Sequence, residues 1–188
     1  MKYIFQSISD QGAYRDNNED AIRFAPVEQA NLAWMVIADG MGGHLAGEVA
    51  SQILVDTVET EMARLVNQNT PYQWDKKQWC NWISNTLQIA NHSIYREAQQ
   101  NASQKGMGTT AVLLVTDGEQ AYIGWVGDSR AYLYRFEDQQ PTLTQLTRDH
   151  TMIQALLDKG AISEKEARQS NQKKHVIQGS RCVQSSPG

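Results

Sequence analysis

The stretch VIADGMGGHLAGEVA, residues 36–50, decides the fold, because in it an apolar run ends in a carboxylate and is followed by a series of glycines. The carboxylate is Asp39, and the glycines that follow it are Gly40, Gly42, Gly43 and Gly47. Ordering glycine costs conformational entropy, so such a series predicts that the backbone closely approaches something. A phosphate, a metal ion and a tight corner of the chain all fit this pattern.

Asp39 has two interpretations that the stretch supports about equally. A carboxylate at the end of a buried strand, followed by the unobstructed carbonyl of Gly40, offers the oxygen ligands that Mg2+ and Mn2+ prefer. Alternatively, the segment is an ordinary turn from a strand into a helix, in which Asp39 caps the helix. A metal ligand and a helix cap therefore both remain open at this point.

A dinucleotide-binding loop fits the glycines less well. The order strand, glycines, helix is correct for such a loop, but Leu45 occupies the position of its third glycine. The acidic residue expected about 20 positions later should end a second strand. Glu59 and Glu61 lie instead inside a predicted helix.

The composition is that of one ordinary globular domain. The chain has 188 residues, 40% hydrophobic and 20% charged, with a net charge of -4. This balance argues against a general nucleic-acid binder or a binder of anionic membranes. The apolar run at residues 32–38 is too short to span a bilayer, and the N-terminus lacks a signal-peptide pattern. Cys80 and Cys182 suggest no disulfide framework, so a cytoplasmic location and a buried, inert Cys80 are expected.

The first half of the chain predicts strands followed by two long helices. Residues 3–8 can form a first strand, the polar segment RDNNED leads into a second, and residues 32–39 form a strand covered on both faces. Apolar residues at helical spacing predict helices over residues 48–66 and 76–100. The tryptophans of the second helix are interpreted as core residues.

The second half predicts an antiparallel meander. Residues 109–116, 120–126 and 130–136 are apolar runs with connections too short for helical crossovers. The Asp-Gly pair in TDGEQ is a strong hairpin signal. Two short helices joined around Gly160 should follow, and residues 179–188 show neither strand nor helix pattern. The order strands, helices, strands favours a layered α+β domain.

Other polar residues are individually weak candidates. The adjacent acids Glu19 and Asp20 would be stabilised by a cation, and Arg15 could bind a phosphate through two hydrogen bonds. For this hexapeptide alone, however, a solvated polar corner is the favoured interpretation. Asp128 follows Gly127 at a turn, where aspartate is common for geometric reasons. His44, His150 and His175 are interpreted as structural or solvent-exposed residues. No serine-hydrolase elbow or zinc-protease motif is present.

Five motifs in order resemble the PPM family of metal-dependent protein phosphatases, also called type 2C, in its bacterial form. They are RDNNEDA, VIADGMGGHLAGEVAS, GMGTTAVLL, WVGDSRAYLYR and LTRDHT, and the resemblance covers residues 1 to about 178. It implies an α+β fold, a four-layer αββα sandwich of two antiparallel sheets flanked by helices. It also implies a single catalytic domain over residues 1–188, with a variable flap at about residues 151–175.

The resemblance assigns roles to particular residues. Asp39 matches the carboxylate that bridges two metal ions, Gly40 and Glu19 match ligands of the second ion, and Asp20 matches an acid that acts mainly through metal-bound water. Asp128 matches a ligand of a third, weaker metal, and Arg15 matches the arginine that holds the substrate phosphate. The implied cofactors are Mn2+ or Mg2+, as two or three ions. A water between two cations would attack phosphorus in line, without a phosphoenzyme.

Two features depart from the family pattern. Met41 stands where the animal branch has a histidine proposed as general acid, so no residue is assigned to protonate the leaving group. Family members also continue with a second Asp-Gly and an Asp-Asn pair that hold the first metal, whereas this sequence has no acidic residue after Glu166. The chain is therefore expected to lack the C-terminal part of the domain and to be a poor catalyst by itself.

The leading hypothesis is hydrolysis of phosphoserine and phosphothreonine in proteins. The expected partners are phosphorylated substrates of a serine/threonine kinase, with no nucleic acid and no membrane, and the chain is expected to be a cytoplasmic monomer in signal transduction. A second hypothesis is an impaired module that binds phosphoproteins or a partner through the Arg15 pocket. A third, weaker one is nucleotide binding at the glycine loop. Metal-dependent hydrolysis of a phosphopeptide separates these hypotheses.

Overall fold

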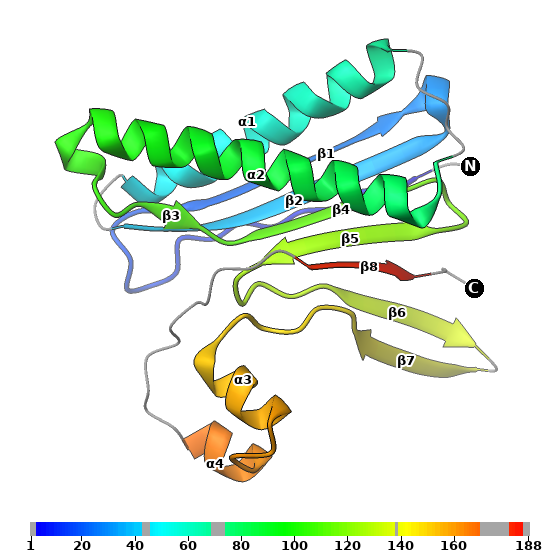
Figure 1. Ribbon diagram of the computed structural model, residues 1–188. Helices are drawn as coiled ribbons and strands as arrows, with labels where there is room; N and C mark the ends of the chain where they lie inside the picture. The colour runs from blue at the N-terminus through cyan, green and yellow to red at the C-terminus, as the bar shows by residue number, and fades with distance from the viewer. Residues whose placement is uncertain (1–2, 43–45, 69–73, 138, 170–180, 186–188) are drawn as a thin grey trace.

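The computed structural model describes residues 3–42, 46–68, 74–137, 139–169 and 181–185. Figure 1 shows two long helices over one face of a sheet, with a separate hairpin and two short helices beyond the sheet. The elements are β1 (Asp20–Val27), a 3-10 turn (Glu28–Ala30), β2 (Leu32–Met41), α1 (Ala46–Asn67), α2 (Lys76–Gln100), a second 3-10 turn (Ala102–Gln104), β3 (Gly108–Thr109), β4 (Ala111–Thr116), β5 (Ala121–Val126), β6 (Tyr132–Glu137), β7 (Gln140–Gln145), α3 (Met152–Asp158), α4 (Glu164–Gln169) and β8 (Arg181–Ser185).

The strands form two antiparallel sheets. The larger sheet has the order β1-β2-β4-β5-β8, and the short β3 also pairs with the end of β2. The smaller sheet consists of β6 and β7. Helix α1 packs on β1 and β2, and α2 packs on β5 and β8. The α+β sandwich class is therefore confirmed, with the second sheet made of β6 and β7 among the described residues.

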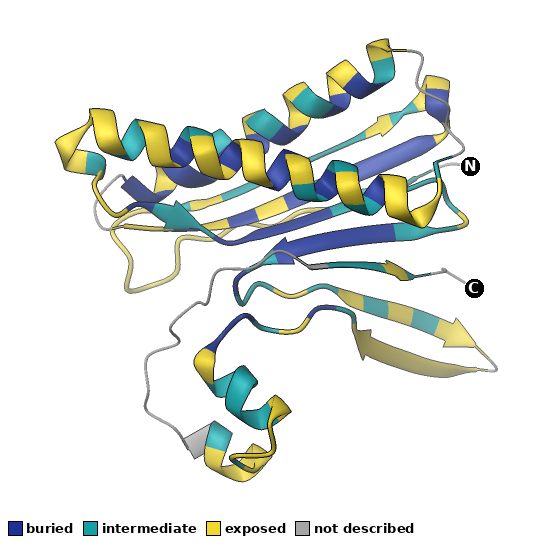
Figure 2. Ribbon diagram, in the orientation of Figure 1, coloured by how far each residue is buried: buried dark blue, intermediate teal, exposed yellow. Residues whose placement is uncertain are grey.

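The burial of β2 explains why an apolar run ends in an exposed carboxylate. The first half of the strand is almost wholly buried, whereas its second half alternates between buried and exposed residues (Figure 2). Val36 and Ala38 belong to the core cluster that also contains residues of α1 and α2. Since successive side chains of a strand point to opposite faces, Ile37 and Asp39 project from the face away from these helices. The prediction of a strand covered on both faces holds for its first half alone.

Both long helices are confirmed, and the start of α2 has a local cause. Helix α2 starts with a capping box, in which the Asp75 carboxylate accepts from the Gln78 amide at 2.8 Å and the Gln78 side chain accepts from the Asp75 amide at 2.9 Å. The tryptophans of α2 pack in the core as predicted, with Trp79 buried in it and Trp82 partly buried against it. Trp79 is 3% exposed, stacks on Tyr122 with ring centroids 5.8 Å apart and meets Trp74 edge to face.

The predicted three-stranded meander is correct only for its first two strands. Strands β4 and β5 pair antiparallel around the Asp117-Gly118 turn, where Gly118 has φ +91°. Strand β6, however, pairs with β7 and not with β5. The chain turns out of the large sheet at Gly127, which has φ +100°, and β8 occupies the position next to β5. Apolar alternation alone did not distinguish between these partners.

Residues 3–8 do not form the predicted first strand. Ile4 and Ile8 are 84% and 90% exposed, so the apolar pattern of this segment does not face a core. Side chains hold the segment instead: Phe5 stacks on Phe24 of β1 at 4.8 Å, and the Tyr3 hydroxyl donates to the Asn31 carbonyl at 3.1 Å. The strand prediction was therefore wrong, although the aromatic residues of the segment are used in packing.

The expectations for the C-terminal tail and the cysteines are also corrected. Strand β8 forms where no strand pattern was seen, and its pairing of Cys182 with Gly124 of β5 brings the cysteine under α2. There it forms a disulfide with the half-buried Cys80, with a Cα–Cα distance of 5.6 Å. Cys80 is therefore not a buried, inert thiol. The expectation of a cytoplasmic location rested on unpaired cysteines and has lost that support.

The two short helices of the flap segment are confirmed as α3 and α4. Gly160, with φ +66°, ends the turn after α3, and the Thr151 hydroxyl caps α3 by accepting from the Gln154 amide at 3.2 Å. Several sequence expectations lie outside the described residues: those for Gly43, His44, residues 69–73 and the flap beyond residue 169, including His175. Among the described helices, none is long and apolar enough to cross a bilayer.

Candidate metal centre

The pairing of β1 with β2 brings two of the predicted acids together. Asp20 and Asp39 are direct partners in the antiparallel register, so their side chains share one face of the sheet. Both residues are exposed, at the end of the sheet where β2 leads toward α1. Residues 19 positions apart in the sequence thereby become adjacent on the sheet.

Glu19 is fixed against the start of α1. Its carbonyl accepts from the Gly40 amide at 3.1 Å and lies 2.7 Å from the Ser51 hydroxyl. Its carboxyl group lies so close to the first turn of α1 that a Cβ on Gly47 would be 2.7 Å from the Glu19 Oε1 atom. A negative charge is favourable there, because the first turn of a helix carries unpaired amide donors and the positive end of the dipole.

Close packing explains two of the conspicuous glycines. A Cβ on Gly40 would overlap the carbonyl of Gly47 and lie 2.6 Å from the carbonyl of Glu19. A Cβ on Gly47 would meet Glu19 and lie 2.8 Å from the Met41 amide. Both positions therefore exclude side chains because β2, the Glu19 segment and α1 meet there. The close approach inferred from the sequence is an approach of the chain to itself around the acidic residues.

Thr110 connects Asp39 to the loop that carries Asp128. The Asp39 amide donates to the Thr110 hydroxyl at 3.0 Å, and the Thr110 amide donates to the Asp39 carbonyl at 2.9 Å. The same hydroxyl lies 2.7 Å from the hydroxyl of Ser129, the residue after Asp128. Sequence reasoning assigned no role to Thr110 or Ser129, although both stand in quoted motifs, because the contact joins strands distant in sequence.

The segment TRDH, residues 147–150, holds the Asp128 loop from its other side. The His150 amide donates to the Gly127 carbonyl at 2.9 Å, and the Ala131 amide donates to the Thr147 hydroxyl at 3.0 Å. Arg130 forms a two-bond ion pair with Asp149, with both N–O distances 2.8 Å. The pKa of Arg130 is raised chiefly by its hydrogen bonds to Asp149. Both ends of the loop are therefore anchored.

The charges of the other four predicted side chains all influence the pKa of Asp39. The pKa of Asp39 is raised by partial desolvation and then by the charges of Asp20, Asp128 and Glu19, while Arg15 opposes the shift. Arg15 also forms an ion pair with Glu19, with Nη1 3.9 Å from Oε2. The structure thus brings these residues to one region. Within the described parts of the chain, however, no three acidic, histidine or cysteine side chains are close enough to enclose a metal ion.

The raised pKa of Asp39 predicts a small gain in stability for Asp39→Asn in metal-free protein. Because the folded pKa exceeds the ordinary value of about 3.9, the contribution of Asp39 to stability is fully present below that pH. It is lost as the pH rises through the folded pKa. The variant should therefore gain no more than about 0.5 kcal/mol at neutral pH, because water screens this exposed group. At a pH below the ordinary pKa of about 3.9, the variant should gain no stability.

Urea denaturation with a chelator, at neutral and acidic pH, measures this difference. Glu119→Gln is the matched control, because it removes an exposed carboxylate from the distant turn between β4 and β5. An equal gain in both variants would show that net charge, and not the neighbours of Asp39, is responsible.

Comparison with known proteins places this arrangement in one family. The sequence model described as "Protein phosphatase 2C" matches residues 13–176. The chain belongs to this protein phosphatase 2C family. It is 34% identical over 176 residues to "Protein phosphatase PhpP" of Streptococcus pneumoniae, a match that covers 91% of this chain and 65% of PhpP. It is 32% identical over 169 residues to "Serine/threonine protein phosphatase PstP" of Mycobacterium tuberculosis, covering 90% of this chain and 29% of PstP.

A solved structure of a relative contains the expected kind of metal. The catalytic domain of PstP in complex with two manganese ions is 29% identical and superposes with a TM-score of 0.70. The match covers 95% of this chain and 70% of that domain. The family is metal-dependent, and these relatives are named as a serine/threonine protein phosphatase, PstP, and a protein phosphatase, PhpP. The chain itself spans 29% of the length of PstP and 65% of that of PhpP.

Proposed function

We propose that the chain hydrolyses phosphoserine and phosphothreonine in proteins with Mn2+ or Mg2+ as cofactor. The observation that carries the proposal is the position of Asp39 in a member of this family: Asp20 is its direct partner across β1 and β2, and the charges of Asp20, Asp128, Glu19 and Arg15 act on it. Carboxylate and carbonyl oxygens suit hard divalent cations, so these residues fit the metal in the chemistry of their donor atoms. The proposed ligands are Glu19, Asp20, Asp39, the Gly40 carbonyl and Asp128.

Some residues of the site would bind the metal or the phosphate, and others hold these residues in position. A bound divalent cation would supply Lewis-acid chemistry to the phosphate and to an attacking water. Thr110 holds the backbone of Asp39 and keeps the Asp128 loop beside it, while Ser51 and Gly40 hold the Glu19 backbone. The guanidinium of Arg15 is the proposed donor to the substrate phosphate, which a planar fork can bind through two hydrogen bonds.

The impaired binding module is not favoured, because the matched relatives are named as phosphatases. We also propose that the substrates are proteins phosphorylated by a serine/threonine kinase and that the chain is a monomer. The nucleotide-binding hypothesis has lost its basis, since Gly40 and Gly47 are required by contacts within the chain.

The test of the proposed function is phosphate release from a phosphothreonine peptide with excess Mn2+. Release unaffected by a chelator, or binding of the peptide without any release, would contradict it.

Arg15→Ala should raise KM for the phosphopeptide by about tenfold or more and change kcat less, because a charged hydrogen-bonding group is lost from substrate binding. The fold should be unaffected, since the Arg15 side chain is 75% exposed and its ion pair with Glu19 is long. Steady-state kinetics with Mn2+ measures the effect. Arg23→Ala is the control, because Arg23 pairs with Asp56 and Glu59 instead. Equal KM values for both variants would show that Arg15 does not contribute to substrate binding.

A further inference from the structure

A cavity of about 540 Å³ lies between α2 and the strands beneath it. We name it the α2 cavity; its walls come from α2, from Leu54 of α1 and from residues of β2, β3, β4 and β5. None of the proposed metal ligands lines it. Its volume falls in the range of small-molecule sites, which are mostly apolar with a few polar groups.

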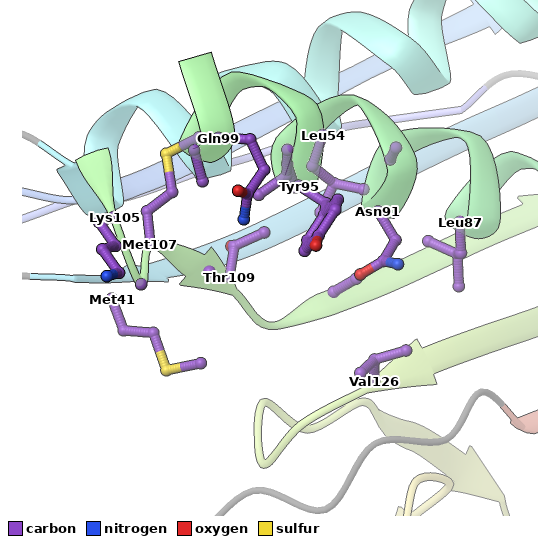
Figure 3. A pocket seen from close by; sticks show the side chains of 16 residues that line it. Met41, Leu54, Leu87, Asn91, Tyr95, Gln99, Lys105, Met107, Thr109 and Val126 are labelled. Atoms are coloured by element: carbon purple, nitrogen blue, oxygen red, sulfur yellow. The ribbon is translucent and has the colours of Figure 1, made fainter. Parts of the chain in front are cut away.

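The lining of the α2 cavity is mostly apolar. One wall is a helical stripe in which Leu87, Ala90, Ile94 and Ala98 recur at spacings of three and four residues. Leu87 and Val126 lie at one end, and Met41 and Lys105 lie at the other (Figure 3). The part of α2 that lines the cavity, from Leu87 to Gln99, extends about 18 Å along the helix, given a rise of about 1.5 Å per residue. The cavity therefore suits an elongated apolar body.

Lys105 gives the cavity a charged end. Among the described lining residues, it is the one with a formal charge, and none of them is acidic. A turn fixes its position: the Met107 amide donates to the Gln104 carbonyl at 3.1 Å, and Gly106 follows Lys105 with φ +83°. Met107, 8% exposed, anchors the end of this turn in a core cluster. The exposed ammonium thus stands at the rim next to an apolar interior.

We propose that the α2 cavity binds a small amphiphilic anion, with its apolar body along α2 and its carboxylate at Lys105. The apolar lining stabilises the body by removing it from water. The ammonium of Lys105 attracts the charged end and leaves it partly hydrated at the rim. The polar side chains along the cavity, Asn91, Tyr95, Gln99 and Thr109, offer further hydrogen bonds. The site is separate from the proposed phosphatase chemistry.

Calorimetric titration of the metal-free chain with decanoate, below its micelle concentration, tests the proposal. Decanoate should bind saturably at one site. Acetate, which lacks the long alkyl chain, should bind at least about tenfold more weakly. Decyltrimethylammonium, which keeps the alkyl chain but carries a positive charge, should also bind at least about tenfold more weakly. Metal-free protein keeps this result independent of the phosphatase proposal. Absence of saturable decanoate binding, or equal binding of the ammonium compound, would overturn the assignment.

Two variants and one control locate the site. Lys105→Glu should weaken decanoate binding by about fivefold or more, because an exposed ion pair becomes a repulsion. Asn91→Trp, at an exposed position on the cavity wall, should weaken it by filling the space. Lys77→Glu makes the same charge change near the start of α2, outside the cavity, and should have no effect. Equal weakening by both lysine variants would assign the binding to net charge and contradict the proposed site.

Discussion

Gly40→Ala is expected to lower the free energy of unfolding by about 3 kcal/mol or more. The new Cβ would overlap the carbonyl of Gly47 and crowd the carbonyl of Glu19, and both neighbours are backbone atoms that cannot rotate away. Relief requires β2 to move away from α1, which separates Glu19 from its contacts with the helix. Urea denaturation of the metal-free variant measures the loss.

Gly108→Ala is the matched control for Gly40→Ala. Gly108 lies on β3 and pairs with Met41, the residue after Gly40. Its new Cβ would meet the end of the flexible Met41 side chain at 3.0 Å, which can move. The control should lose no more than about 1 kcal/mol. Equal losses in the two variants would contradict the explanation of Gly40 by backbone contact.

Arg130→Met is expected to cost about 3 kcal/mol of stability, because it leaves the Asp149 carboxylate without its two-bond partner. The Asp149 side chain is 7% exposed, so water cannot replace the lost donors well. The loop with Asp128 should also become looser, because this ion pair ties it to residues 147–150. Urea denaturation gives the stability of the variant.

A double-mutant cycle assigns this loss to the ion pair. Adding Asp149→Asn to Arg130→Met should cost little more, with a coupling energy of about 2 kcal/mol. Arg148→Met is the control, because the Arg148 side chain is 57% exposed and its pair with Asp158 should contribute less than about 1 kcal/mol. Additive effects of Arg130→Met and Asp149→Asn would contradict the importance of the pair.

The sequence predicted well those features that arise from local patterns. Helix α2 has the predicted bounds, residues 76–100, because its apolar stripe and capping residues are local signals. The Asp117-Gly118 turn likewise follows from its residue types. Strand partners do not follow from such signals. The partner of strand β6 was wrongly predicted and the tail strand β8 was missed, because distant parts of the chain decide which strand pairs with the edge of β5.

In the candidate site, too, features with local sequence motifs could be predicted, whereas contacts between distant segments could not. The acids could be identified from ordered motifs, and the register of β1 with β2 explains how Asp20 reaches Asp39. The supporting contacts of Thr110 could not be predicted, because a threonine in a strand has no distinctive pattern. The disulfide was missed for a related reason: Cys80 and Cys182 are 102 residues apart, and only the pairing of β8 with β5 brings them together.

Titration of the chain with Mn2+, comparing the wild type with Asp39→Asn, tests most directly the claim that these acids form a metal centre. Calorimetry should show Mn2+ binding that Asp39→Asn weakens by at least about tenfold, since loss of a ligand should cost no less than loss of a residue that merely orients one. The control Glu119→Gln should bind like the wild type, because it removes a carboxylate far from the site. Equal Mn2+ affinities for the wild type and Asp39→Asn would contradict the account.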